Sequence, residues 1–250
     1  SSIKPFVYSA ALEKGFSPAT LMNDAPLSLP GGKGGQPWEP RNDDGFDGPI
    51  SLRQALARSK NVVAVRLLQA ISPQYARDYL QRFGFDAAKH PANLTMVLGS
   101  GSVTPLQMAG AYAVFANGGF TVTPRLVQKI TDARGNVLWE APPPPARLEE
   151  QRAIDPRNAF IIDSMLREVA RSGTGAQASQ RLGRNDLAGK TGTTSDAVDG
   201  WFAGYSGNVV AVSWMGYDQP KSLGGREFGA TLALPIWIDY MRQALSGKPP

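Results

Sequence analysis

The sequence predicts an α+β fold, with helices first and a meander of three strands after them. Apolar residues recur at helical spacing through 62–71, whereas over the last eighty residues the spacing of apolar residues changes to one that favours strands. Three strands are expected there, at Leu187–Thr194, Trp201–Ser206 and Val209–Tyr217. A tight Gly207-Asn208 turn joins the last two, so we expect them to pair in antiparallel fashion.

A helix and then a long loop are expected at the start of the chain. Residues 1–14 carry apolar positions at helical spacing, and Ser1 or Ser2 can cap this helix. Residues 17–50 are rich in glycine and proline, which predicts a surface loop with short extended pieces. Its Gly31–Gly35 run lacks the Gly-Lys-Ser/Thr ending of a phosphate-binding loop, so a flexible loop is the simpler interpretation.

Several of the later helices are marked by a capping residue at their start. Ser51 can cap the first of them, and Thr104 and Asp155 each precede a proline that suits the first helical position. The expected helices cover 51–57, 62–71, 73–83, 105–116, 155–171 and roughly 230–245.

A hairpin and a proline-rich connector are expected between the helices at 105–116 and 155–171. The two strands of the hairpin are expected at Leu126–Ile130 and Asn136–Trp139, with Arg134-Gly135 in the turn. The following stretch, 141–150, begins with a run of prolines and predicts a semi-rigid connector.

The residue inventory excludes several chemistries. The 250 residues contain no cysteine and a single histidine, His90. A thiolate nucleophile, a cysteine-ligated metal, a disulfide framework and a multi-histidine metal site are therefore excluded. A Ser-His-Asp triad is possible only with His90 as its base. We expect no cofactor or metal, and proton transfer by Lys, Asp, Glu or Tyr.

Charge and hydropathy narrow the class of protein further. The net charge is +5, but the basic residues are scattered and form no run of five or more, so no nucleic-acid partner is expected. The longest strongly apolar stretches, such as Val209–Met215, are far shorter than the ~20 residues that a spanning helix needs. One domain is the default for this length.

Ser1 and Lys4 form the first of three short patterns that can carry chemistry. Residues three apart share a helix face, so the Lys4 amine is expected beside the Ser1 hydroxyl. A serine hydroxyl becomes a good nucleophile when a base takes its proton. Lysine can do so only when neutral, which requires burial or nearby cations to lower its pKa. Alone, the pattern equally describes a cap followed by a solvated lysine.

The other two patterns are Ser59-Lys60-Asn61 and Lys190-Thr191-Gly192-Thr193. Ser59 could relay a proton, and Asn61 offers both an amide donor and a carbonyl acceptor, although both residue types are also ordinary helix caps. In the second pattern a lysine supplies a cation and threonine hydroxyls can hold a carboxylate. A glycine in a strand lets a ligand approach the backbone, although a β-bulge with exposed polar residues is an alternative.

Together the three patterns resemble a known signature. The order Ser-x-x-Lys, Ser-x-Asn, Lys-Thr-Gly-Thr is that of penicillin-binding proteins and class A β-lactamases. Flanking stretches extend the resemblance, and they lie at 1–6, 38–42, 52–57, 104–109 and 200–205. The chain resembles the transpeptidase domain of class A, bifunctional penicillin-binding proteins, and looks most like the 1A type.

The resemblance implies a penicillin-binding, serine β-lactamase-like fold, with an antiparallel sheet flanked by helices and an all-helical lobe. Residues 1–250 would be a partial transpeptidase domain, completed by a segment ahead of Ser1 or by a companion chain. A glycosyltransferase domain and a membrane anchor are implied further upstream. The protein is then expected at the periplasmic face of the bacterial inner membrane, held there only by that anchor.

The resemblance also implies catalytic roles. Ser1 would be the acylated nucleophile and Lys4 its general base. Ser59 would pass the proton to the leaving amine. The backbone N–H groups of Ser1 and Thr193 would form the oxyanion hole.

Substrate binding is implied for the remaining motif residues. Asn61 would hold the peptide side of the donor. Lys190 would lower the pKa values of the site and attract the substrate carboxylate, which Thr191 and Thr193 would bind beside Gly192.

The implied reaction is a pair of acyl transfers on peptidoglycan stem peptides. Ser1 attacks the D-Ala-D-Ala bond of one stem peptide and releases D-Ala. An amine of a neighbouring stem peptide then takes the acyl group and makes a cross-link. β-Lactam antibiotics mimic the donor and would acylate the same serine.

Three other functions share part of the pattern. An N-terminal-nucleophile hydrolase would use the α-amine of Ser1 as its base, but it leaves the Lys190 motif unexplained. A β-lactam sensor would acylate without turnover. A D,D-carboxypeptidase or β-lactamase would use water as acceptor, and no clear deacylating glutamate lies near Asn61.

Overall fold

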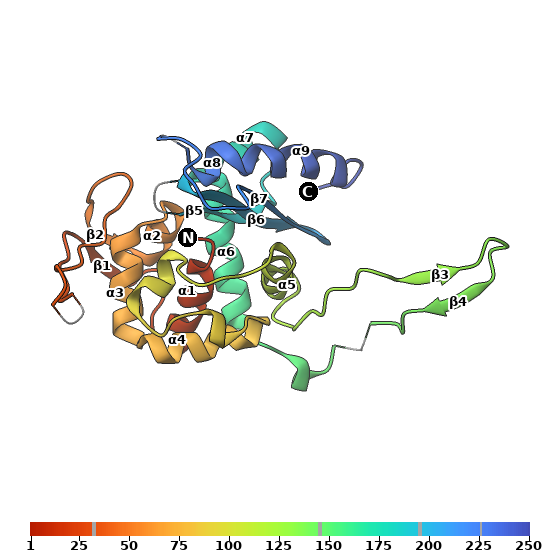
Figure 1. Ribbon diagram of the computed structural model, residues 1–250, viewed down its shortest axis with the longest axis horizontal. Helices are drawn as coiled ribbons and strands as arrows, with labels where there is room; N and C mark the ends of the chain where they lie inside the picture. Colours follow the sequence, from red (N-terminus) through yellow and green to blue (C-terminus); the bar gives the residue numbers. More distant parts are fainter. Residues whose placement is uncertain (32–33, 145–146, 195–196, 226) are drawn as a thin grey trace.

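The structure is an α+β fold in which helices cover both faces of a small antiparallel sheet. The computed structural model describes residues 1–31, 34–144, 147–194, 197–225 and 227–250 (Figure 1). The sheet has the order β5-β6-β7, formed by Ala188–Thr193, Asp199–Ser206 and Val209–Gly216. Both neighbouring pairs are antiparallel, as the sequence predicts, with Gly192 opposite Trp201 and Trp201 opposite Trp214.

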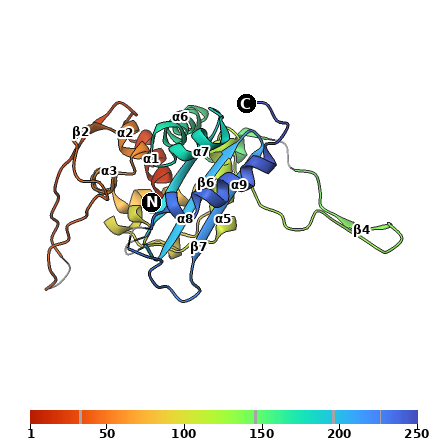
Figure 2. The same cartoon turned by 90° about the horizontal axis from the view of Figure 1, so that it is seen from above.

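The helices lie in three groups, one on each face of the sheet and one in a separate lobe. The helices are α1 (Lys4–Glu13), α2 (Leu52–Ala57), α3 (Asn61–Ile71), α4 (Pro73–Leu80), α5 (Pro105–Ala116), α6 (Pro156–Ser172), α7 (Ala176–Leu182), α8 (Gly229–Leu232) and α9 (Leu234–Ala244). Helices α5 and α6 pack on one face of the sheet, and α8 and α9 on the other (Figure 2). Helix α7 packs against α6 and α9. Helices α1 to α4, with 3₁₀ turns at 81–83, 87–89 and 94–98, form the helical lobe.

Side-chain capping was predicted correctly for three helices. Ser51 accepts a hydrogen bond from the Gln54 N–H, and Asp155 accepts one from the Arg157 N–H. Thr104 takes part in a reciprocal capping box with Gln107 at the start of α5. These bonds occupy N–H groups that have no partner inside the helix, which fixes where each helix begins.

The predicted cap of the first helix is wrong. Helix α1 begins at Lys4 with Ile3 at the N-cap and no side-chain cap bond. The Lys4 N–H instead bonds to the main-chain carbonyl of Ser1 at 3.1 Å, so neither serine hydroxyl is needed as a cap. The Ser1-Ser2 turn that results leads straight into the helix.

Two other helical predictions need correction. Helix α7 was not predicted, because its N-cap position is Gly175 and carries no side-chain cap. The single helix expected over 230–245 is two helices, α8 and α9, because Pro235 in the first turn of α9 cannot donate the hydrogen bond that would continue α8.

The long 17–50 loop contains short extended pieces, as predicted. Strands β1 (Leu21–Asp24) and β2 (Gly48–Ser51) pair in antiparallel fashion, and Leu29 forms an isolated bridge with Trp38. Part of the Gly31–Gly35 run, residues 32–33, lies outside the described residues. The pairing of β1 with β2 is accompanied by contacts of the 41–47 loop with the start of α3, beside the Ser-x-Asn pattern.

The hairpin lies on an arm that extends away from the body of the molecule (Figure 1). Its strands are β3 (Lys129–Thr131) and β4 (Val137–Glu140), so the first begins three residues later than the predicted strand at 126. The 141–150 connector follows; its residues 145–146 lie outside the described residues, and a 3₁₀ turn begins at Glu149.

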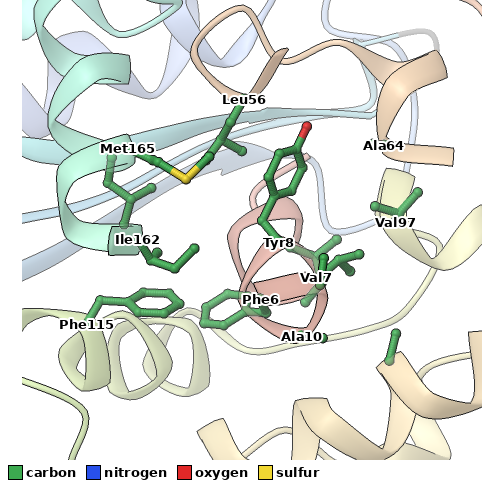
Figure 3. Packing of buried hydrophobic residues seen from close by; sticks show 14 of the residues in the cluster. Phe6, Val7, Tyr8, Ala10, Leu56, Ala64, Val97, Phe115, Ile162 and Met165 are labelled. Carbon is green, nitrogen blue, oxygen red and sulfur yellow. The ribbon is translucent and has the colours of Figure 1, made fainter. Parts of the chain in front are cut away.

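Helix α1 runs through the main hydrophobic core, and its packing there fixes the position of its first turn. Residues 4–11 are all buried. The Phe6 ring lies against Phe115 and three other aromatic rings, with centroid separations of 4.7–5.2 Å (Figure 3). Each such buried side chain contributes about 1.5–3 kcal/mol of transfer free energy. The Ser-x-x-Lys pattern is therefore attached to a helix that is buried in the hydrophobic core.

Candidate active site

The Ser1-Ser2 turn lies against the end of strand β5. A Cβ atom added at Gly192 would come within 3.1 Å of the Ser2 nitrogen and of the Ser2 Cβ. Only a residue without a side chain allows the strand to approach this turn so closely. The Lys-Thr-Gly-Thr pattern and the Ser-x-x-Lys pattern are thus brought together, as the sequence predicts for a shared site.

Lys4 and Lys190 converge on one hydroxyl group, that of Ser59. The Lys4 Nζ lies 3.0 Å from Ser59 Oγ and also donates to the Ser59 carbonyl at 2.9 Å. The Lys190 Nζ lies 2.8 Å from the same Ser59 Oγ. Asn61 completes the group, because its Oδ1 accepts a 2.7 Å bond from Lys4. Residues from three separate sequence motifs therefore form one hydrogen-bonded cluster.

Ser59 is held in an unusual backbone conformation. Its φ angle is +54°, in the left-handed region that residues other than glycine seldom adopt. Main-chain bonds hold it there: the Ser59 N–H bonds to the Leu56 carbonyl and the Lys60 N–H to the Ala55 carbonyl. This turn ends α2 and starts α3, and it presents the Ser59 hydroxyl to both lysines. Strain of this kind is typical of functional sites.

Burial lowers the pKa of both lysines. Desolvation lowers the pKa of Lys4 to about 7, against the opposing effect of Asp43 and Asp44. Desolvation, followed by the nearby charge of Lys4, holds the pKa of Lys190 well below its usual value. Their hydrogen-bond acceptors among the described residues are hydroxyl, amide and carbonyl oxygens rather than carboxylates. A neutral lysine is therefore accessible near neutral pH.

Ser1 lies between two hollows of the surface. One, of about 790 Å³, is lined by Ser1, Asn61 and Thr193 on one side and by loop residues that include Arg41 and Phe228. The other, of about 470 Å³, also reaches Ser1 and Thr193. A ligand in either hollow can thus contact Ser1.

The two threonines of the third pattern have different surroundings. Thr193 lines both hollows, and its Oγ1 accepts a 2.8 Å bond from the Gly229 N–H. Thr191 is 5% exposed and its hydroxyl is hydrogen-bonded to Thr174 at 2.7 Å. The surface next to Ser1 therefore offers the Thr193 hydroxyl and not that of Thr191.

His90 does not form part of the lysine and serine cluster. Its ring is 3% exposed and lies edge-on to Phe85 at a centroid separation of 5.6 Å. Neither ring nitrogen has a hydrogen-bond partner among the described residues, and burial lowers the pKa of the imidazole. A Ser-His-Asp triad would need a carboxylate on one ring nitrogen and the serine on the other. Among the described residues His90 makes neither contact, so the structure does not support a triad with His90 as its base.

The part of the chain that the structure describes holds no group of three or more His, Cys, Asp or Glu side chains arranged to bind a metal ion. None of its helices is both long and apolar enough to cross a bilayer.

Sequence reasoning missed two residues that contact the motif from outside. Asn42 accepts hydrogen bonds from the N–H groups of Asn61 and Val62 at 2.9 and 3.0 Å. Lys60 is buried beside them and forms ion pairs with aspartates far away in the chain. The sequence signals for these residues were the position of Lys60 inside the Ser-x-Asn pattern and that of Asn42 at the end of the 38–42 stretch that extends the resemblance.

Comparison with known proteins gives consistent matches along the chain. A family model described as the penicillin binding protein transpeptidase domain matches residues 1–236. Penicillin-binding protein 1A of Neisseria gonorrhoeae is 50% identical over 250 residues, which is 99% of this chain and 31% of that protein. Penicillin-binding protein 1A of Pseudomonas aeruginosa is 42% identical and matches 100% of this chain and 36% of its own length. The chain thus spans about a third of these curated relatives.

Solved structures agree with the sequence matches. Penicillin-binding protein 1A from Haemophilus influenzae superposes with a TM-score of 0.91 at 37% identity, covering 100% of this chain and 42% of that one. The penicillin-binding protein PonA1 from Mycobacterium tuberculosis superposes with a TM-score of 0.80 at 27% identity, covering 100% and 68%. The chain therefore belongs to the family of penicillin-binding protein transpeptidase domains.

Proposed function

We propose that this domain is a peptidoglycan D,D-transpeptidase that forms cross-links through an acyl-enzyme on Ser1. The observation that carries the proposal is the convergence of two buried lysines of lowered pKa on the Ser59 hydroxyl, next to Ser1. Such a cluster can accept a proton and pass it on at neutral pH without histidine or metal.

The acylation step follows from this arrangement. Neutral Lys4 takes the proton of the Ser1 hydroxyl, and the oxygen attacks the carbonyl carbon of the penultimate D-Ala. The amide C–N bond breaks, and the proton reaches the leaving nitrogen through the Ser59 hydroxyl, which lies 3.0 Å from Lys4. The products are free D-Ala and an ester on Ser1. The N–H groups of Ser1 and Thr193 are proposed to stabilise the oxyanion.

The second acyl transfer reverses the proton path. An amine of a neighbouring stem peptide attacks the ester carbon, and its proton passes through the Ser59 hydroxyl to Lys4. The bond between the carbonyl carbon and Ser1 Oγ breaks, and Lys4 returns the proton to Ser1 Oγ. The Ser1 hydroxyl is restored and a new amide bond joins the two peptides. The Lys190 amine, 2.8 Å from Ser59 Oγ, holds the Ser59 hydroxyl in the relay by a hydrogen bond.

Donor binding is proposed for the hollow shared by Ser1, Asn61 and Thr193. The Thr193 hydroxyl would bind the donor carboxylate, and that negative charge would favour the protonated form of Lys190 on the same strand. Gly192 would give the donor close access to the strand. Asn61 would hold the donor peptide through the second N–H of its Nδ2, because its Oδ1 accepts from Lys4 and its first N–H donates to the Arg41 carbonyl. The burial of Thr191 shifts the carboxylate contact towards Thr193.

The wider setting of the domain follows from its family. We propose that the full-length protein is a bifunctional peptidoglycan synthase with a glycosyltransferase, anchored in the bacterial inner membrane and facing the periplasm. β-Lactams, which mimic the donor, would form the same ester on Ser1. This part of the proposal rests on the relatives, whose length exceeds that of the chain about threefold.

Labelling with a fluorescent penicillin tests the proposal directly. The full-length protein should be labelled covalently at Ser1, as located by mass spectrometry of the labelled peptide, and Ser1→Ala should abolish labelling. Labelling that survives Ser1→Ala contradicts the nucleophile assignment. Incubation with a donor pentapeptide and an acceptor amine should yield D-Ala plus the cross-linked peptide; hydrolysis product alone would favour a carboxypeptidase.

A further inference from the structure

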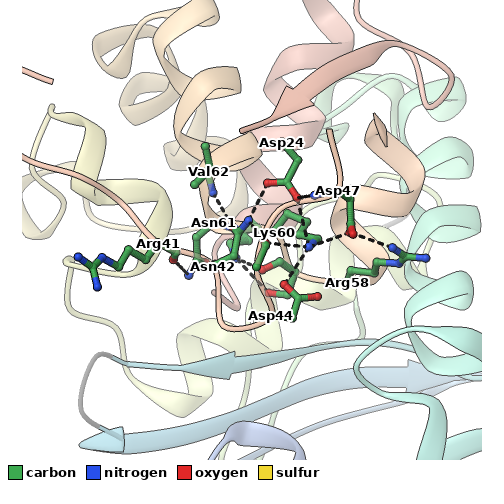
Figure 4. Close-up of polar contacts among 12 residues, drawn as sticks. Asp24, Arg41, Asn42, Asp44, Asp47, Arg58, Lys60, Asn61 and Val62 are labelled. Atoms are coloured by element: carbon green, nitrogen blue, oxygen red, sulfur yellow. Dashed lines mark hydrogen bonds and ion pairs between the residues drawn. The ribbon is translucent and has the colours of Figure 1, made fainter. Parts of the chain in front are cut away.

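The middle residue of the Ser-x-Asn pattern, Lys60, points away from the catalytic lysines into a cluster of acids. Its side chain is 0% exposed. Its Nζ lies 3.2 Å from Asp24, 2.8 Å from Asp44 and 2.8 Å from Asp47 (Figure 4). Burial acts to lower the pKa of Lys60, but its hydrogen bonds to these three carboxylates raise it overall. Lys60 therefore stays charged and acts as a fixed cation.

Asp24 is the fixed point of this cluster. Its side chain is 0% exposed at the end of β1. One carboxylate oxygen accepts a 2.6 Å bond from the Asn42 amide, and the other accepts the Asp47 N–H at 2.9 Å. Asp24 thus ties strand β1 to both ends of the 42–47 loop, while Lys60 ties the same loop to the catalytic turn.

Asn42 transmits this arrangement to the catalytic motif. Its Oδ1 accepts the first two N–H groups of α3, those of Asn61 and Val62. These N–H groups have no acceptor within the helix, so Asn42 acts as a cap supplied by a distant loop. The Asn61 side chain is fixed from both ends, because its Nδ2 donates to the Arg41 carbonyl at 2.8 Å and its Oδ1 accepts from Lys4.

We infer that Asp24, Asn42 and Lys60 form a clamp that positions Ser59 and Asn61 for acyl transfer. These three are positioning residues, since none of their side chains contacts Lys4, Lys190 or the Ser59 hydroxyl, and Asn42 contacts Asn61 only at its main-chain N–H. The inference rests on the proposed function, whose catalytic groups are the ones being positioned. The clamp also fixes residues 41–43, which line the hollow beside Ser1.

The clamp accounts for the strained turn at Ser59. A left-handed serine persists only when its surroundings enforce it. Lys60 follows Ser59 directly and is anchored by three carboxylates, and Asn61 is anchored by the Asn42 cap. Without these anchors the turn can relax, and displacement of a catalytic group by about 1 Å can cost roughly 100-fold in rate.

Two variants test the clamp in the full-length protein. Lys60→Met removes the cation, and Asn42→Ala removes the cap of α3. Each should slow penicillin acylation by about 10–100-fold, with the loss in the first-order acylation step rather than in the initial binding constant. Arg58→Met is the matched control, because Arg58 also pairs with Asp47 but is 51% exposed; it should acylate at the wild-type rate.

A double variant separates positioning from stability. Lys60→Met leaves Asp24 buried without its cation, so its melting temperature should fall. Asp24→Asn combined with Lys60→Met removes both buried charges and should recover part of that loss, while acylation stays at least about 10-fold slow. Acylation that recovers in step with the melting temperature, or wild-type rates in Lys60→Met and Asn42→Ala, overturns the inference. Absence of labelling in the wild-type protein would instead count against the proposed function.

Discussion

Among the residues that the structure describes, three lysines are buried, and they occupy opposite kinds of environment. Lys4 and Lys190 contact uncharged oxygens, and burial lowers the pKa of each. Lys60, one residue from their common partner Ser59, contacts three carboxylates, and its pKa is raised. Burial is the same in all three cases, with at most 1% of each residue exposed. The charge of the partner oxygens therefore decides whether a buried lysine is a base or an anchor.

The environment of Lys4 predicts the largest effect on chemistry. Lys4→Arg keeps a cation but cannot lose its proton, so acylation by penicillin should fall by about 10²–10⁴-fold. Stopped-flow measurement of fluorescent penicillin binding to the full-length protein gives this rate. A rate within threefold of wild type would show that Lys4 is not the base.

The environment of Lys60 predicts the largest effect on stability. Breaking a buried ion pair by removing one partner costs about 3–5 kcal/mol, so Lys60→Met should lower the free energy of unfolding by that order. Lys4→Met removes a buried amine with no carboxylate partner and should leave the free energy of unfolding unchanged or raise it. Denaturant unfolding of both variants compares the two sites, and equal destabilisation would remove the distinction between base and anchor.

Lys190 should have a smaller effect than Lys4. It contacts the Ser59 hydroxyl and the Thr191 carbonyl but does not take the proton of Ser1 in the proposed mechanism. Lys190→Met should therefore slow acylation by roughly 100-fold while Lys4 stays in place. Comparison of acylation rates for the two lysine variants tests this order, and a smaller loss for Lys4 than for Lys190 would reverse their roles.

Most of the fold could be predicted because its signals are local. The caps at Ser51, Thr104 and Asp155 each act within three residues, and the Gly207-Asn208 turn fixes the pairing of β6 with β7. The failures have equally local causes. Helix α7 follows glycine with no side-chain cap, and the Ser1 carbonyl, rather than a serine hydroxyl, accepts the first N–H of α1.

Motif order predicts the candidate catalytic residues, but it does not predict their mutual contacts. Helical spacing puts Ser1 and Lys4 on one face, yet it gives no sign that Lys190 and Lys4 share the Ser59 hydroxyl. The roles of Asn42 and Lys60 were missed because their partners, such as Asp24, lie on β1 and on a loop that only folding brings to α3. Neither hydrophobic periodicity nor spacing along the chain encodes such contacts.

The pH dependence of acylation tests the central claim most directly. Only neutral Lys4 can take the proton of Ser1 in the proposed mechanism, and burial lowers the pKa of Lys4 to about 7 against the opposing effect of Asp43 and Asp44. The second-order rate constant for penicillin acylation of the full-length protein should therefore rise with pH to a plateau, with a midpoint near 7. A midpoint near the ordinary lysine value of ~10.4, or a rate that does not change between pH ~5 and ~9, would contradict the account.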